Sequence, residues 1–173
     1  MFTTSTIRNT ILAVAGVYAM LQPTASWAAV RTSAASDLPL SQRDLRATYS
    51  GKSWFWKKGV AYFDKNGRFY AWAGSDSKPA YVKGTWGAYK NGKICFSGNW
   101  RSTDGDGFEV TCFWHKYGNG EILQRREPDG KWYTFKNARR KKDGEYYKLV
   151  SGNHVSAKWK QIDRNFKPYI DVY

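Results

Sequence analysis

Five glycine-containing turn signals divide residues 50–136 into short segments, and this spacing constrains the fold more than any other feature. The signals are Asp64–Gly67, Asn91-Gly92, Asp104–Gly107, Gly118–Gly120 and Pro128–Gly130. The segments between them are rich in aromatic and β-branched residues, which favour strands. We therefore expect strands at residues 53–56, 60–63, 68–73, 80–88, 93–100, 108–116, 121–126 and 131–135.

Short strands with tight connections pair most simply in sequential antiparallel order. Closing or curling such a sheet protects its edges. The predicted fold class is therefore all-β: a small antiparallel up-and-down barrel or curled meander of about eight strands, calycin-like. A short N-terminal helix should precede it, because Ser41 is a good N-cap, Asp44 follows three residues later and Leu45 supplies an apolar contact. This helix should end near residues 49–51.

Two further local predictions concern turns and the end of the chain. Asn91-Gly92 is the strongest turn signal, since a two-residue mirror-type turn needs positive φ at both positions. Such a turn would place Lys90 opposite Lys93. Beyond a basic loop at residues 137–144, residues 146–150 and 155–160 are candidate strands.

The two cysteines can be placed by the register of one hairpin. If that hairpin is centred on residues 102–105, then Trp100 faces Gly107 and Cys95 lies directly opposite Cys112. Opposed residues at a non-hydrogen-bonded pair are close enough for a disulfide. We therefore predict a Cys95–Cys112 disulfide, with two free thiols as the alternative.

The first residues resemble a secretory signal peptide. Arg8 precedes an apolar run at residues 11–21, and Pro23 and the small-residue site Ser26-Trp27-Ala28 follow. An apolar run of about 11 residues is too short for a membrane anchor, which needs about 20. We expect residues 1–28 to be a signal peptide, 29–40 a flexible leader, 41–160 a β-barrel-like domain and 161–173 a C-terminal tail. The predicted location is periplasmic or secreted, with no transmembrane segment after cleavage.

The expected mature chain is strongly basic. The whole chain has 28 Lys and Arg against 14 Asp and Glu. Residues 1–28 contain Arg8 and no acid, so 27 basic residues remain against 14 acidic ones, a net charge of +13. A basic excess of this size attracts anionic polymers. Nucleic acid fits this chemistry, but export to the envelope argues against it.

Several aromatic and cysteine motifs occur in an order that is similar to a known family. They are the run Gly51–Trp72, then Gly84-Thr85-Trp86-Gly87, Lys93–Phe96, Thr111–His115 and Glu127–Tyr133. Over most of residues 41–153 the chain resembles the exported alphaproteobacterial family called domain of unknown function 995. The resemblance implies an envelope or secreted protein with a disulfide between Cys95 and Cys112. It implies no reaction and no catalytic residues.

The residues offer little for catalysis. Nucleophilic catalysis needs an activated Ser or Cys with a base, but only His115 and His154 are available and no Gly-x-Ser-x-Gly motif is present. His115 lies in an expected strand beside Trp114, which favours a structural role. Asp104, Asp106 and Glu109 form the tightest acidic cluster, which is explained more simply as a glycine-rich hairpin tip than as a metal or glycosidase site. We predict no catalytic residues, no metal and no cofactor.

The candidate ligand-binding residues combine charge with flat rings. They are the basic cluster Arg139, Arg140, Lys141 and Lys142, and the tryptophans Trp54 and Trp56 on one strand face. A solvated loop is nevertheless the favoured explanation of the cluster, and core packing that of the tryptophans. These residues favour a non-enzymatic envelope protein that binds an anionic polysaccharide or other envelope polymer. The alternatives are a periplasmic partner of a membrane protein, a polysaccharide-active or cell-wall enzyme, and a barrel that holds a small apolar ligand.

Overall fold

A computed structural model of the chain describes residues 37–139 and 144–159. The expected signal peptide, the C-terminal tail and the basic residues Arg140, Lys141 and Lys142 lie outside these ranges. The elements in chain order are α1 (Gln42–Tyr49), β1 (Lys52–Trp56), β2 (Gly59–Phe63), β3 (Arg68–Gly74), β4 (Pro79–Ala88), β5 (Lys93–Ser102), β6 (Gly105–Gly118), β7 (Glu121–Arg126), β8 (Tyr133–Lys136), the 3₁₀ helix η2 (Glu145–Lys148) and β9 (Leu149–Ser151).

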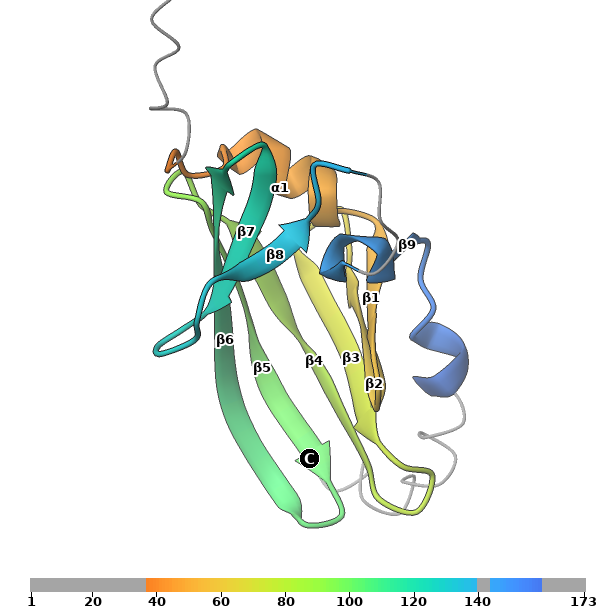
Figure 1. Ribbon diagram of the computed structural model, residues 1–173. Helices are drawn as coiled ribbons and strands as arrows, with labels where there is room; N and C mark the ends of the chain where they lie inside the picture. The colour runs from red at the N-terminus through yellow and green to blue at the C-terminus, as the bar shows by residue number, and fades with distance from the viewer. Residues whose placement is uncertain (1–36, 140–143, 160–173) are drawn as a thin grey trace, which may run out of the picture. The chain divides into compact units, whose positions relative to one another are not determined.

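All nine strands form one antiparallel sheet in the order β8-β7-β6-β5-β4-β3-β2-β1-β9. The sheet curls into a half-barrel (Figure 1), which confirms the predicted curled meander and its helix. The two edge regions are joined by η2. Tyr146 of η2 packs edge-on against Phe135 of β8 at 5.8 Å between ring centroids, and Glu145 accepts a hydrogen bond from the Trp54 indole of β1.

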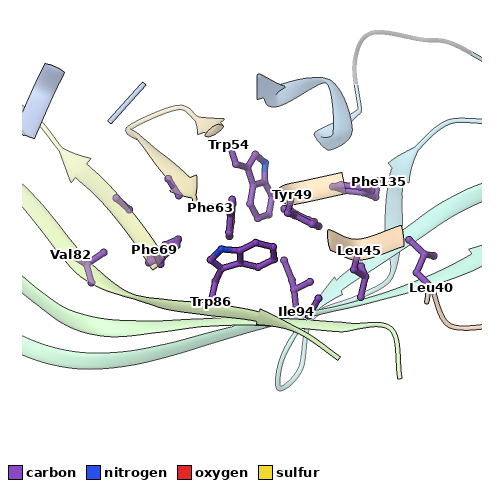
Figure 2. Close-up of a cluster of buried hydrophobic side chains, with 13 residues drawn as sticks. Leu40, Leu45, Tyr49, Trp54, Phe63, Phe69, Val82, Trp86, Ile94 and Phe135 are labelled. Carbon is purple, nitrogen blue, oxygen red and sulfur yellow. The ribbon is translucent and has the colours of Figure 1, made fainter. Parts of the chain in front are cut away.

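Helix α1 forms where its cap predicts. The Ser41 hydroxyl accepts a hydrogen bond from the Asp44 backbone N–H at 3.1 Å, which satisfies one of the free donors at the helix start. Leu45 and Tyr49 lie on one helix face and are buried in the core of the sheet (Figure 2). Helix α1 therefore fills one end of the half-barrel. Leu40, at the end of the expected leader, is also buried, and its N–H donates to the His115 carbonyl of β6.

The Asn91-Gly92 prediction is wrong in its turn type. Tyr89, rather than Lys90, pairs with Lys93, so three residues form the loop. Gly92 alone has a positive φ, of 83°, which is typical of a three-residue loop. The Gly92 carbonyl accepts a hydrogen bond from the His115 N–H, which ties this loop to β6. The two-residue turn with positive φ at both positions is Asn119-Gly120, between β6 and β7.

The expected strand at residues 155–160 is also wrong. The Asn153 side chain accepts hydrogen bonds from the N–H groups of Val155 and Ser156, and residues 156–159 are helical. Val155 and Trp159 cover the outer face of the sheet beside Tyr81. The expected strand at 146–150 exists only as β9, which begins at Leu149 after η2, and the last predicted meander strand begins at Tyr133 rather than residue 131.

Cys95 and Cys112 lie directly opposite each other on β5 and β6 and form a disulfide. The same register pairs Trp100 with Gly107, as the hairpin argument predicts. The bridge lies on the outer face of the sheet, because the neighbouring Phe96 and Phe113 pack against the inner core.

Replacing both cysteines, Cys95→Ala with Cys112→Ala, should lower the free energy of unfolding by about 3 kcal/mol, since the bridge closes a loop that constrains the unfolded chain. Urea unfolding followed by tryptophan fluorescence measures this loss. The wild-type protein under reducing conditions is the control and should match the variant. A loss too small to resolve would contradict a stabilising role.

A cluster of hydrogen-bonded polar side chains is buried between α1 and the sheet. His115 Nε2 is 2.8 Å from the Tyr49 hydroxyl and 2.8 Å from Gln124 Nε2, and the Gln124 amide also donates to Tyr49. The Gln124 oxygen accepts from the Tyr133 hydroxyl. Because His115 Nε2 accepts hydrogen bonds here, the ring is neutral. Burial lowers the pKa of His115 to about 4.

This depressed pKa predicts acid sensitivity. In the unfolded chain this histidine takes up a proton below about pH 6.5, whereas in the folded protein it does so only below about pH 4. The free energy of unfolding therefore decreases as the pH is lowered from about 6.5 to about 4, by up to about 3 kcal/mol. His115→Gln should remove this component of the slope of unfolding free energy against pH. Chemical denaturation between pH 7 and pH 4 measures the slope. His154→Gln, at an exposed position, is the control, and a slope unchanged in His115→Gln would contradict the assignment.

Candidate functional site

The inner face of the half-barrel contains a pocket of about 360 Å³. Core side chains and α1 fill the end of the half-barrel beside the pocket, as Figure 2 shows for Leu45, Tyr49 and Phe135. One flank of the pocket is apolar and comes from β1, β2 and β3: Trp54, Trp56, Ala61, Phe69, Ala71 and Ala73. The other comes from β5, β6 and β7: Phe96, Trp100, Glu109, Thr111, Phe113 and Arg126. Glu145 of η2 completes the lining.

Two of the sequence candidates, Trp54 and Trp56, lie in this pocket. Trp54 is buried, packs edge-on against Phe113 at 5.3 Å, and its indole N–H donates to Glu145 at 3.1 Å. Trp56 is 40% exposed. Its indole lies directly over Gly59, where a Cβ atom would be only 2.4 Å from the ring. The core prediction therefore holds for Trp54, while Trp56 is an exposed ring that lies over Gly59 at the edge of the pocket.

The polar side chains of the pocket nearly balance in charge. Glu109 and Thr111 of β6 face inward beside Arg126 of β7. Within the described residues, neither Glu109 nor Arg126 forms an ion pair. Glu145 is paired with Lys148. The pocket therefore offers one free carboxylate and one free guanidinium next to a wall of rings.

A second feature lies on the outer face of β5, β6 and β7. Here cations alternate with indole rings in the order Lys93, Trp114, Arg125, Trp132, Lys116, which we call the basic–aromatic row. Lys93 lies 5.0 Å and Arg125 5.9 Å from the Trp114 ring centroid. Arg125 lies 5.4 Å and Lys116 4.7 Å from the Trp132 ring centroid. Cation–π attraction of this kind holds charge and ring faces side by side.

Strand pairing builds this row. Trp114 is opposite Lys93 on β5 and opposite Arg125 on β7, so these three side chains share one face. Trp132 lies between β7 and β8 and is 40% exposed. The sequence reasoning missed this site because its cations are single residues on separate segments. The signal that could have revealed it is the pairing of Trp114 with Lys93 and with Arg125 across neighbouring strands.

The basic cluster is not placed at either feature. Arg139 is exposed in the segment after β8, and Arg140, Lys141 and Lys142 lie outside the described residues. Whether this cluster binds a ligand stays a prediction.

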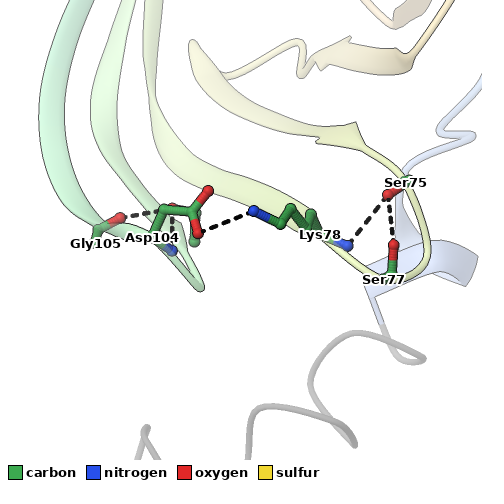
Figure 3. Close-up of polar contacts among 6 residues, drawn as sticks. Ser75, Ser77, Lys78, Asp104 and Gly105 are labelled. Carbon is green, nitrogen blue, oxygen red and sulfur yellow. Dashed lines mark hydrogen bonds and ion pairs between the residues drawn. The ribbon is translucent and has the colours of Figure 1, made fainter.

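The acidic cluster lines a hollow at the hairpin tip between β5 and β6, where Asp104, Asp106 and Glu109 come together. Asp104 and Asp106 are at the exposed hairpin tip, where Asp104 lies 3.6 Å from Lys78 (Figure 3) and Asp106 lies 3.8 Å from Arg101. Glu109 lines both this hollow and the pocket inside the half-barrel. Within residues 37–139 and 144–159, no group of three or more His, Cys, Asp or Glu side chains could hold a metal ion. His115 is buried among core side chains and does not line the pocket.

No helix among the described residues is long and apolar enough to cross a membrane. The disulfide is compatible with a location outside the cytoplasm, where such bonds persist.

Comparison with known proteins gives a family and no function. No curated protein and no solved structure matches the chain. A family model described as "Protein of unknown function (DUF995)" matches residues 17–155, in agreement with the resemblance of the aromatic and cysteine motifs. Because this match spans most of the chain, the protein belongs to the DUF995 family.

Proposed function

We propose that this protein is a non-enzymatic, exported protein of the cell envelope that binds an anionic polysaccharide or other anionic envelope polymer. The observation that supports the proposal is the basic–aromatic row on the outer face of β5, β6 and β7. It combines positive charge with flat apolar rings on one surface. Sugar rings have apolar faces that can lie against indole rings, and carboxylate or phosphate substituents pair with Lys and Arg.

Arg125 is the central cation of the row. Its guanidinium contacts both Trp114 and Trp132, and within the described residues it forms no ion pair. A planar guanidinium can bind a carboxylate through two parallel hydrogen bonds. An anionic group that meets Arg125 would therefore also lie against an indole ring.

The two lysines of the row are already paired with carboxylates. Lys93 lies 2.9 Å from Glu127 and Lys116 lies 2.6 Å from Asp37. Asp37 is 77% exposed, whereas the Lys93 and Glu127 side chains are 25% and 27% exposed. Ion pairs open to solvent contribute about 1 kcal/mol or less, so the Lys116 pair is the easier of the two to displace. A polymer with many negative charges can compete for these lysines, and the net charge of the chain favours its approach.

A periplasmic protein partner is the second candidate. It is supported by an apolar part of the outer face that lies nearer the hairpin tip than the basic–aromatic row does. Phe108 and Val110 of β6 are 65% and 60% exposed and lie on the same outer face near the hairpin tip. Exposed apolar side chains that share a face favour contact with another protein. A partner whose binding depends on these two residues, with no affinity of the protein for polysaccharide, would select this function.

The charges of the row can be tested with a matched pair of variants. Lys93→Gln with Lys116→Gln should weaken binding to immobilised polygalacturonate about tenfold, because two positive charges of the row are lost. Lys57→Gln with Lys58→Gln removes the same charge from the exposed turn between β1 and β2. Binding is measured from the salt concentration at elution, with neutral dextran as the control resin.

The proposal expects the first variant to elute at lower salt than the second. Equal elution of both variants would show that net charge alone is responsible. Retention on polygalacturonate that does not respond to salt, or no retention of the wild-type protein, would contradict the proposal.

A further inference from the structure

We propose that the pocket inside the half-barrel is a second binding site, and that it takes an uncharged sugar unit. The pocket lies on the opposite face of the sheet from the basic–aromatic row, because successive side chains of β6 point to opposite faces: Phe113 lines the pocket and Trp114 belongs to the row. The inference therefore does not rest on the polymer-binding function and can be tested apart from it.

The first step concerns the rings. Trp56 on β1 and Trp100 on β5 line opposite flanks of the pocket. The Trp56 indole lies over Gly59, where a Cβ atom would not fit. Between these flanks, Ala61, Ala71 and Ala73 occupy inward positions with small side chains. Flat rings at the sides and small residues between them leave room for a flat, partly apolar molecule.

The second step concerns the polar groups. Glu109, Thr111 and Arg126 lie on the flank formed by β6 and β7. Together they offer hydrogen-bond donors and acceptors, as neighbouring hydroxyl groups of a sugar require. A few placed polar groups opposite an apolar wall are typical of a small-molecule site, and about 360 Å³ lies at the small end of such pockets.

The third step excludes other ligand classes by charge. Glu109 and Arg126 are exposed at the rim of the pocket, and a fatty acyl chain would reduce their access to water without offering them hydrogen bonds, which is unfavourable. A singly charged organic ion would gain from one of these side chains but be repelled by the other, because Glu109 and Arg126 line the same flank. A neutral molecule with one apolar face and a hydroxyl-bearing edge satisfies the rings and both charged side chains.

A hollow of about 550 Å³ at the hairpin tip of β5 and β6 adjoins the pocket and is lined by further polar side chains, Asp104 and Asp106 among them. The two share Ala73, Trp100 and Glu109. A single sugar unit would fill only the pocket, whereas a chain of two or more units could also occupy the hollow. We therefore expect an oligosaccharide to bind more tightly than its monosaccharide.

The experiment uses cellobiose, maltose and the disaccharide of N-acetylglucosamine as neutral probes, with decanoate and choline as probes of the excluded classes. Isothermal titration calorimetry and tryptophan fluorescence measure binding to the full mature chain. At least one neutral disaccharide should bind the wild-type protein. Trp56→Ala should weaken that binding about tenfold or more, since the indole supplies a large flat apolar surface for the sugar face.

The matched control is Trp132→Ala. Trp56 and Trp132 are both 40% exposed, so both variants should fold, but Trp132 lies in the basic–aromatic row. Its replacement should leave disaccharide affinity unchanged. Ala73→Leu, at a half-buried position of the pocket, should weaken binding by filling space, and circular dichroism checks that each variant is folded.

Several outcomes would overturn the inference. They are a folded wild-type protein that binds none of the neutral disaccharides, a disaccharide affinity that Trp56→Ala leaves unchanged, and binding of decanoate or choline that Trp56→Ala abolishes. Failure of polymer binding would be separate, because Lys93→Gln with Lys116→Gln should bind the disaccharide as the wild-type protein does.

Discussion

The pairing of β5 with β6 decides which aromatic side chains enter the half-barrel and which remain outside. A shift of one residue in this register would move every side chain of a strand to the opposite face. Phe113 would then leave the pocket and Trp114 would enter it. The Cys95–Cys112 disulfide joins two directly opposed residues of this pair and is compatible only with the observed register. The separation of the basic–aromatic row on the outer face from the pocket on the inner face depends on that pairing.

The two ends of the half-barrel differ because their inward side chains differ in size. Near α1, large rings such as Tyr49, Phe63 and Trp86 fill the interior, and the ring centroids of Phe63 and Trp86 lie 5.4 Å apart. Beyond them, Ala71 and Ala73 leave space on β3. The polar group around His115 lies in the filled end. Its position explains why this histidine contributes to packing and acid sensitivity rather than to the pocket.

Local signals in the sequence were sufficient for much of the fold. The Ser41 cap, the strand segments and the Cys95–Cys112 pairing all follow from interactions between near neighbours or within one hairpin. The errors arose where tertiary contacts override local preference. Gly92 is tied to β6 through its carbonyl group, which favours a longer loop, and Val155 packs on the outer face at the start of a helical segment.

The candidate site was harder to predict. Lys93, Lys116 and Arg125 are isolated in the sequence, whereas the predicted cluster was a continuous basic run. Their assembly depends on the combined register of three strands. The pocket depends on curvature of the sheet, which no single segment encodes. Trp54 and Trp56 were correctly placed on one face, but their spacing could not show that only Trp56 would remain exposed.

The most direct test of the separation between the two faces is a two-dimensional NMR titration that follows the indole N–H signals of assigned tryptophans. Polygalacturonate should shift the signals of Trp114 and Trp132, and a neutral disaccharide should shift those of Trp56 and Trp100. Shifts of the same tryptophans by both ligands would contradict the assignment of two binding faces, as would ligand binding that shifts none of the four.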